Sequence, residues 1–234
     1  MGESLLPGAE EMERALGDLG VALDAVEADA EGVVRLTAPP GLLEEFIAPR
    51  LVEFAAQHPK VRLELDASVG YADLTRGEAD IALRVRRPDR GDLVSRKLVS
   101  VRSLVLGAPQ LVAAIGVLRH TDAAPWIAWG HELAQIPEAR WMAKHVRTPP
   151  ILRTSSFGSQ LNAASAGLGL CLVPEVYARP HGLVAVRPGR ALAAAFAELP
   201  VGDLWLVGHV ALRRVPRVEA VWEFLVAELT KPWP

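Results

Sequence analysis

The chain has 234 residues, half of them apolar, and a formal charge of −3. This size supports one large domain or two small ones with a real core, and the slightly acidic balance argues against a surface that binds nucleic acid by itself. Cys171 is the only cysteine, so no internal disulfide is possible and nothing requires an oxidising compartment. The N-terminus carries no secretory signal pattern, and the longest apolar uncharged run, 103–118, is too short to span a bilayer. We expect a soluble, cytoplasmic protein.

The first segment, residues 1–31, is acidic and periodic. Nine acids against one base give it a charge of −8, which leaves +5 for the remainder of the chain. Its apolar residues recur at alternating steps of four and three, as in a coiled-coil seam. The seam consists of Leu5, Ala9, Met12, Leu16, Leu19, Leu23 and Val26. The pattern fits either an amphipathic helix lying on its own domain or a dimerising coiled coil.

From Gly32 onward strand patterns alternate with helical patterns. Strands are predicted at 33–38, 61–65 and 81–85, the second half-buried because apolar and charged residues alternate. A helix before Pro59 is expected to use one apolar face, made of Phe46, Ile47, Leu51, Phe54 and Ala55. A short helix is predicted near 73–76. This β-α-β-α-β order favours a parallel sheet flanked by helices.

A second α/β unit is predicted to begin near Ser103. Its expected strands are 104–106, 126–128, 151–154, 170–173 and 183–186, and its expected helices are 109–114, 137–144 and 156–166. A strand at 204–209 and a terminal helix follow. That helix carries one apolar stripe, formed by Val218, Val221, Trp222, Leu225, Val226 and Leu229. Gly167 is predicted to end the helix before it, and Gly169 to lie in a close backbone turn.

Patterns typical of catalysis are missing from the sequence. The six histidines form no HExxH motif and have no cysteine partners, so we expect no metal site. No G-x-S-x-G nucleophile motif occurs, and Gly167-Leu168-Gly169 lacks the third glycine of a dinucleotide fingerprint. We therefore expect neither an enzyme nor a bound cofactor.

A binding site is favoured instead, because ligands in open α/β sheets lie beyond the carboxyl ends of the strands. Pro39-Pro40-Gly41 forms one such turn, and Ser155-Ser156 precedes a helix that begins near Phe157. The serine hydroxyls fit either helix capping or ligand contact. Arg84 and Arg86 bracket the end of a predicted strand, where a guanidinium can bind a carboxylate. The other cations between the two predicted units also fit a solvated loop, which we favour for Arg87 and Arg90. Trp126 and Trp129 fit a core position, although Trp129 lies past the end of its predicted strand.

The order of several stretches resembles the effector-binding domain of LysR-type transcriptional regulators. The stretches are Gly32–Leu36, the helix with Pro49 and Phe54, His58–Leu63, Leu74–Ala82 and Ala166–Pro174. Gly2–Leu6 resembles the close of that family's winged helix-turn-helix domain, and the heptad run resembles its dimerising linker helix.

The resemblance implies two Rossmann-like subdomains of the type II periplasmic-binding-protein fold, preceded by a remnant of the linker helix. The implied divisions are a linker at 1–31, subdomain I at 32–103 and 204–234, and subdomain II at 104–203. An effector would bind in the cleft between the subdomains. The residues implied to line it are Pro39, Pro40, Gly41, Ser68, Arg84, Arg86, Trp129, Ser155, Ser156 and Phe157. Members often have a hydroxyl residue where this chain has Pro39-Pro40, which puts a standard carboxylate contact from that side in doubt.

The same resemblance implies partners. We expect a small effector, anionic or polar, and a homodimer or higher oligomer. No helix-turn-helix pattern occurs in the sequence, so DNA would be contacted only through a domain absent from this chain. We favour truncation over a regulator that naturally lacks its DNA-binding half and sequesters partners. Two further alternatives are a solute-binding protein of the same fold, disfavoured by the missing signal peptide, and a transferase or lyase on a related two-domain scaffold, disfavoured by the missing acid–base or metal cluster.

Overall fold

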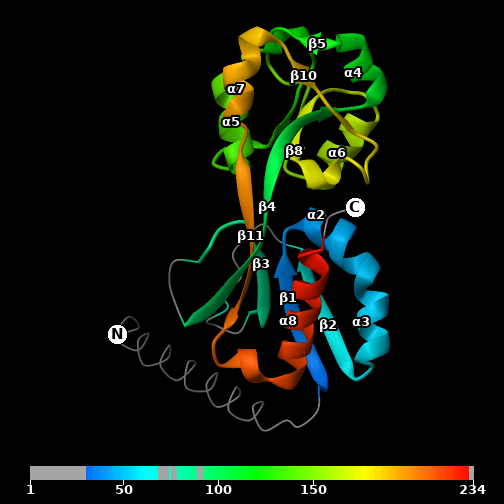
Figure 1. Ribbon diagram of the computed structural model, residues 1–234, viewed down its shortest axis with the longest axis vertical. Coiled ribbons are helices and arrows are strands. Elements are labelled where there is room, and N and C mark those ends of the chain that lie inside the picture. Colours follow the sequence, from blue (N-terminus) through cyan, green and yellow to red (C-terminus); the bar gives the residue numbers. More distant parts are fainter. Residues whose placement is uncertain (1–29, 68–73, 75–77, 89–91, 232–234) are drawn as a thin grey trace, which may run out of the picture. The chain divides into compact units, whose positions relative to one another are not determined.

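The computed structural model describes residues 30–67, 74, 78–88 and 92–231. The chain forms two compact units, and each is described by itself (Figure 1). Unit 1 combines residues up to Val99 with those from Asp203 onward, and unit 2 is the continuous stretch Ser100–Gly202. The predicted coiled-coil seam, Ser68 and nearly all of the predicted helix at 73–76 lie outside the described residues.

Unit 1 contains the parallel strands predicted for it. Strand β1 (Gly32–Ala38) runs parallel to β2 (Val61–Ala67) and to β3 (Ile81–Arg84), and β11 (Val201–His209) pairs antiparallel with β3. The strand order is β2-β1-β3-β11, so β2 is an edge strand. The predicted half-buried alternation in β2 is wrong beyond its first residues. Val61 is buried, but Leu65 is 39% exposed.

The segment between β1 and β2 is helical but changes its winding. The successive pieces are α2 (Pro40–Leu42), a π-helical turn at Leu43–Ile47, a 3₁₀ turn at Ala48–Arg50 and α3 (Leu51–Gln57). Pro49 lacks the N–H that a continuous α-helix would use, which accounts for the change near it. The predicted apolar face is confirmed at Phe46, Ile47 and Phe54, whereas Ala55 is exposed.

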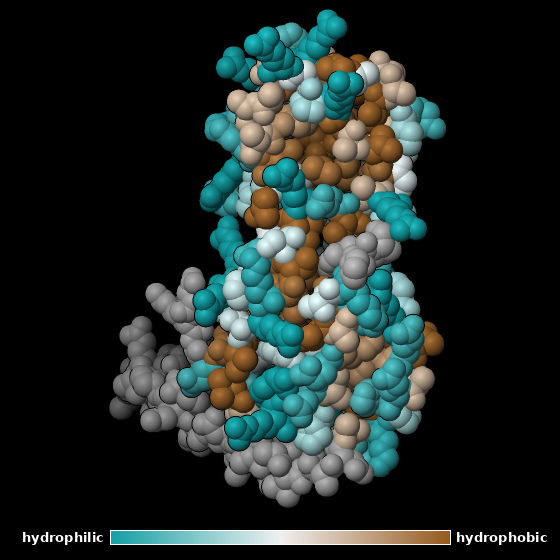
Figure 2. Space-filling model, in the orientation of Figure 1, coloured by the Kyte–Doolittle hydropathy of each residue, from teal (hydrophilic) through white to brown (hydrophobic). Residues whose placement is uncertain are grey.

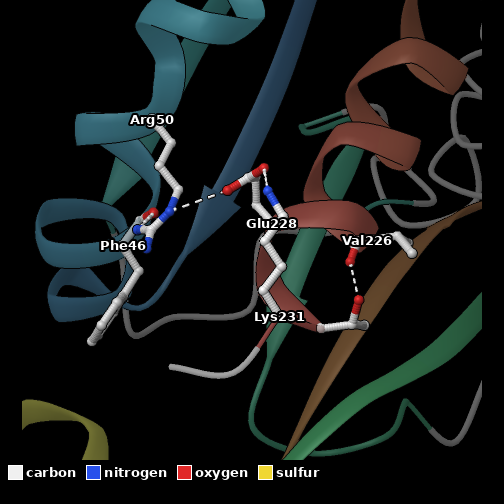
Figure 3. A network of polar contacts seen from close by, with 6 residues as sticks. Phe46, Arg50, Val226, Glu228 and Lys231 are labelled. Atoms are coloured by element: carbon white, nitrogen blue, oxygen red, sulfur yellow. Dashed lines mark hydrogen bonds and ion pairs between the residues drawn. The ribbon is translucent and has the colours of Figure 1, made fainter. Parts of the chain in front are cut away.

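Helix α8 (Pro216–Leu229) packs against β1 and buries all six residues of its predicted stripe. The Phe224 ring lies 5.1 Å from that of Phe54 in α3, so these two helices touch. A polar network joins the same helices (Figure 3). Arg50 Nε lies 3.2 Å from a carboxylate oxygen of Glu228, which is nearly buried, and an Arg50 Nη donates to the carbonyl oxygen of Phe46 at 2.6 Å. Apolar packing and this partly screened ion pair together fix α8 on the unit.

Strand β4 (Leu93–Gly107) is much longer than predicted. The expected strand began at residue 104, and the cationic stretch before it was assigned to a connection. Arg96 and Lys97 instead lie within β4, and Lys97 Nζ forms a 2.7 Å ion pair with Asp203 of β11. Residues of β4 and of β11 belong to both units, so the two units share these strands.

Unit 2 repeats the parallel arrangement. Strand β6 (Ile127–Trp129) runs parallel to β7 (Leu152–Thr154), and a parallel bridge joins Trp126 to Leu170 beside β8 (Cys171–Pro174). Its helices are α4 (Pro109–Ile115), α5 (Pro137–His145), α6 (Phe157–Ser165) and the short α7 (Ala193–Ala197). The short strands are β5 (Val117–Leu118), β9 (Val184–Ala185) and β10 (Arg187–Pro188). The predicted helices are confirmed to within about two residues.

Both glycine expectations of this unit are confirmed. Gly167 adopts φ +85°, a conformation that ends α6 and that L side chains rarely adopt. A Cβ on Gly169 would lie 3.0 Å from the carbonyl oxygen of Pro125, so only glycine allows the two backbones to pass this closely. Trp126 is buried, as predicted, and its indole N–H donates to the carbonyl oxygen of Thr121 at 2.7 Å.

The two units differ in the surface they show in one view. The visible face of unit 2 is largely apolar, whereas that of unit 1 is mostly hydrophilic (Figure 2). Helix α4 of unit 2 contains no charged residue and no fully buried one. No helix in the described ranges is both long and apolar enough to cross a membrane.

Candidate binding site at the strand ends

The turn after β1 offers little polar chemistry. The backbone N–H groups of Leu42 and Leu43 both donate to the carbonyl oxygen of Pro39, at 3.0 and 3.2 Å. Gly41 is buried under the first helical turn. Because Pro39 and Pro40 carry no N–H, the one remaining backbone donor of this turn is the N–H of the buried Gly41. The sequence-based doubt about a carboxylate contact at this turn is consistent with that geometry.

The two arginines at the end of β3 differ strongly in exposure. Arg84 is the last residue of β3, is 7% exposed and lies opposite Trp205 of β11. Arg86, two residues later, is exposed. The guanidinium of Arg87, predicted to lie in a solvated loop, sits 5.6 Å from the centre of the Trp205 ring. Arg84 is therefore held within packed structure, whereas Arg86 is free to turn toward solvent.

In unit 2 the predicted residues meet at the ends of β6 and β7. Trp129 is the last residue of β6, not past its end as predicted, and the first residue of α6 is Phe157. Their rings are stacked almost parallel, 5.6 Å apart, and the edge of the Tyr177 ring contacts Phe157 at 4.6 Å. This row of three aromatic rings is a preformed apolar surface. Sequence analysis missed Tyr177, because nothing near it in the sequence marks it.

The serine hydroxyls are engaged within the unit. Ser156 Oγ accepts a hydrogen bond from the N–H of Ser159 at 3.2 Å, so Ser156 is the N-cap of α6. The N–H of Ser156 donates to the Thr154 hydroxyl at 3.1 Å, and the Ser155 hydroxyl bonds the carboxylate of Glu132. The capping alternative thus describes Ser156, and Ser155 has a carboxylate partner.

Glu132 places a negative charge beside this helix end. Its own backbone N–H, and then the Ser155 hydroxyl, lower the pKa of the carboxyl group below its ordinary value. A Cβ on Gly130 would lie 2.5 Å from a carboxylate oxygen of Glu132, so the glycine leaves room for the side chain to fold back. An anion bound at this end of α6 would meet that carboxylate.

Two buried polar atoms of unit 2 have no hydrogen-bond partner in the described part of the chain. They are the indole nitrogen of Trp129 and the amide oxygen of Gln160, a residue with no exposed surface. The Gln160 amide nitrogen lies 3.5 Å from the carbonyl oxygen of Ile127. Sequence analysis missed Gln160, although a signal was present. It is a polar residue on the stripe that buries Leu161 and Ala164.

The side chains that could ligate a metal ion are not clustered in the described ranges. No group of three or more His, Cys, Asp or Glu side chains is placed there to hold a metal ion. Burial raises the pKa of the Cys171 thiol to about 12, which keeps it protonated and unreactive near neutral pH. What the structure assembles at the strand ends of unit 2 is a group of aromatic rings, a helix N-cap and a carboxylate.

Two α/β units that share strands, with their polar and aromatic groups at the carboxyl ends of parallel strands, define a type II periplasmic-binding-like fold. The family model of the LysR substrate binding domain matches residues 27–230. The chain therefore belongs to the family of LysR substrate binding domains.

Relatives and solved structures agree with this assignment. A "HTH-type transcriptional regulator" of Xanthomonas campestris is 31% identical over 94% of this chain and 64% of its own length. The "AhcY transcriptional activator HvrB" of Rhodobacter capsulatus is 29% identical over 73% of this chain and 61% of its own length. The regulator CrgA of Neisseria meningitidis has the same fold, with a TM-score of 0.72 and 21% identity over 97% of this chain and 79% of CrgA. The chain spans about six-tenths of the length of these two curated relatives.

Proposed function

We propose that this chain is the effector-sensing and dimerising module of a LysR-type transcriptional regulator and is not an enzyme. The observation that carries the proposal is the match to the LysR substrate binding domain over residues 27–230, joined to binding groups at the strand ends of both units. Its regulator relatives are longer than this chain, so DNA contact is proposed only for a helix-turn-helix domain attached to it. The protein acts in the cytoplasm.

The effector is a small anionic or polar molecule bound in the cleft between the units. The groups of unit 1 proposed to contact it are Pro39, Pro40, Gly41, Ser68, Arg84 and Arg86. Those of unit 2 are Trp129, Ser155, Ser156 and Phe157. Arg86 is the exposed cation of the set, and a guanidinium binds a carboxylate through two parallel hydrogen bonds. Arg84 is nearly buried at the end of β3, and we propose that it contributes positive charge to the site from within unit 1. An anionic part of the effector therefore faces unit 1.

A thermal-shift screen of a metabolite library tests this proposal. A ligand present at 100 times its dissociation constant adds about 2.7 kcal/mol to the free energy of unfolding, a shift of several degrees for a domain of this size. Arg86→Ala is expected to weaken the binding of an anionic hit at least tenfold. Arg213→Ala serves as the matched control, because Arg213 pairs with Glu219 and Glu223 on another part of unit 1. A broad library without a single stabilising compound would contradict the proposal.

Dimerisation is proposed through the leader seam and through a second surface on the body. Edge strand β2 and helix α3 of unit 1 expose Val52 and Leu65, at 77% and 39%, beside acidic side chains such as Glu64. In unit 2, edge strand β7 and its approach expose Ile151 at 58% beside basic side chains such as Arg153. Open strand edges with apolar residues are usually covered. Pairing unit 1 of one copy with unit 2 of another gives a two-fold dimer in which every contact occurs twice.

Light scattering on three forms of the chain tests the two surfaces separately. Deleting residues 1–31 should leave a dimer, because the body surface is sufficient. Replacing Leu16 and Leu19 with Asp should weaken only the contact through the leader. Val52→Asp in the shortened chain should yield monomers, since it places a charge at the most exposed apolar position of α3. An intact chain that is monomeric at tens of micromolar would refute both surfaces.

A further inference from the structure

At the end of strand β6 and in the first turn of helix α6, a buried donor and a buried acceptor have no hydrogen-bond partner in the described residues. The donor is the indole N–H of Trp129 and the acceptor is the amide oxygen of Gln160, and neither atom has a partner in the described residues. Gln160 has no exposed surface in the described structure. Buried polar groups are nearly always hydrogen-bonded in folded proteins, so these two atoms require an occupant.

The orientation of the Gln160 amide follows from its surroundings. Only its nitrogen can donate to the carbonyl oxygen of Ile127, which lies 3.5 Å away. The amide oxygen must therefore face elsewhere. Helical side chains lean toward the helix N-terminus, which directs this oxygen under the turn that begins with Phe157. The ring of Phe157, the first residue of α6, stacks on Trp129, so Trp129 and Gln160 both lie at the N-terminal end of this helix.

Hydrogen-bond chemistry restricts what can satisfy both atoms. An ionised carboxylate has no proton to give to the Gln160 oxygen, and an ammonium group has no lone pair to accept from the Trp129 N–H. The carboxylate of Glu132, which binds Ser155 beside the same helix end, further disfavours an anion. A hydroxyl group accepts one hydrogen bond and donates another, so it fits both atoms. The stacked rings of Trp129 and Phe157 provide an apolar surface for the carbon frame that carries it.

We propose that the effector carries a neutral hydroxyl group on an apolar or aromatic frame. This hydroxyl accepts a hydrogen bond from the Trp129 indole N–H and donates one to the Gln160 amide oxygen. The inference rests on the proposed function, since it names the chemistry of the effector on the unit 2 side of the same site.

Phenol, anisole and toluene are suitable probes, because they share a ring and differ in hydrogen bonding. Phenol donates and accepts, anisole only accepts, and toluene does neither. Each is titrated into the uniformly ¹⁵N-labelled full chain, and the indole N–H signals are followed by NMR, with the Trp129 signal assigned through Trp129→Phe. We expect phenol to move the Trp129 signal downfield to saturation, anisole to move it less, and toluene to leave it in place.

Variants test the acceptor. Gln160→Leu keeps the side-chain volume and should weaken phenol binding about three- to tenfold, the usual effect of one hydrogen bond. Gln135→Ala is the matched control, because Gln135 is exposed and its amide oxygen accepts from Arg140 on the surface. If Gln160→Leu does not fold, Trp129→Phe tests the other hydrogen bond of the proposed pair, because it removes the donor, and the same three- to tenfold loss is expected. Phenol binding is then followed through the backbone amide signals of Phe157 and Gly158.

Several outcomes would overturn the inference. The first is a Trp129 indole signal that toluene moves as far as phenol does. The second is a stronger response to benzamide, which carries an amide group in place of the hydroxyl, than to phenol. The third is a Trp129 indole signal that is already downfield without a probe and that no probe moves. The last result would mean that a trapped water fills the site. A library metabolite that binds through Arg86 with an affinity unchanged by Trp129→Phe would also overturn it. That metabolite would leave the proposed sensing function standing, whereas the absence of any stabilising metabolite would refute the function itself.

Discussion

Removing the Ser156 hydroxyl separates the capping role of that residue from a role in ligand binding. Ser156→Ala deletes the oxygen that accepts from the Ser159 N–H at 3.2 Å. Loss of an N-cap side chain costs about 0.5–2 kcal/mol, and we expect about 1 kcal/mol because Ser156 is exposed and water can reach the freed N–H. For a chain of this length that corresponds to a fall in Tm of about 2–4 °C.

Urea denaturation followed by circular dichroism measures the loss directly, with no effector present. Ser156→Asn is the matched control, since its amide oxygen also accepts from the helix N–H groups and adds no charge beside Glu132. It should therefore keep the wild-type midpoint. Ser155→Ala removes only an exposed bond to Glu132, so its change should stay within about 0.5 kcal/mol. A Ser156→Ala chain as stable as wild type, or less affected than Ser155→Ala, would refute the capping role.

Three further predictions concern the rest of the molecule. Trp222 on α8 is only 2% exposed, so Trp222→Ala leaves a cavity in the core. It should lower the free energy of unfolding, measured in urea, by about 3–5 kcal/mol. A smaller loss would mean that neighbouring side chains move into the cavity. Lys144, followed by His145, lowers the pKa of the exposed Glu198 carboxyl group, so this contact stabilises the fold above the ordinary carboxyl pKa and is lost as pH falls through the lowered value. A small Tm difference between wild type and Glu198→Gln should thus be present at neutral pH and absent in acid below the lowered pKa of Glu198. The Cys171 thiol, with its pKa raised to about 12, should react with a thiol reagent at pH 8 only after unfolding; rapid labelling of the native chain would show that unit 2 opens.

Elements with a strong period could be predicted from the sequence because burial and period agree in them. The α8 stripe follows the helical repeat without interruption, and all six of its residues are buried. The parallel pairing of β1 with β2 and β3 followed from the alternation of strand and helix patterns, since a parallel pair needs a crossover between its strands. Pro137 and Pro216 mark helix starts for the same local reason, a fixed φ angle that suits the first helical turn.

Strand β4 was underestimated because its first half has no apolar face to detect. Residues 93–102 carry Arg96, Lys97 and Arg102, and none of the ten is fully buried. What makes this segment a strand is its hydrogen bonding to β11, a partner about a hundred residues later in the chain. Such a partner leaves no local mark on the sequence.

The candidate site shows the same division between local and distant information. The N-cap at Ser156 was predictable as one alternative, because capping depends on residues three positions apart. The bond between Ser155 and Glu132 joins two loops that are distant in sequence, so only the fold reveals it. Gln160 was within reach, since a polar residue on an apolar stripe is a local contradiction. The structure adds that Trp129, which also has an unpaired polar atom, lies beside the same helix.

The way unit 2 interrupts unit 1 sets an order for folding during synthesis. All of unit 2 lies in one continuous stretch, Ser100–Gly202, whereas unit 1 needs residues from Asp203 onward. Those late residues supply strand β11, which pairs with β3, and helix α8, which packs on β1. Domains fold as units while the chain leaves the ribosome, so unit 2 can close on its own while the first strands of unit 1 still lack a neighbour and a covering helix. Unit 1 is therefore translated first and completed last. Until residues from Asp203 onward are made, β3 lacks its neighbour β11 and β1 lacks the cover of α8.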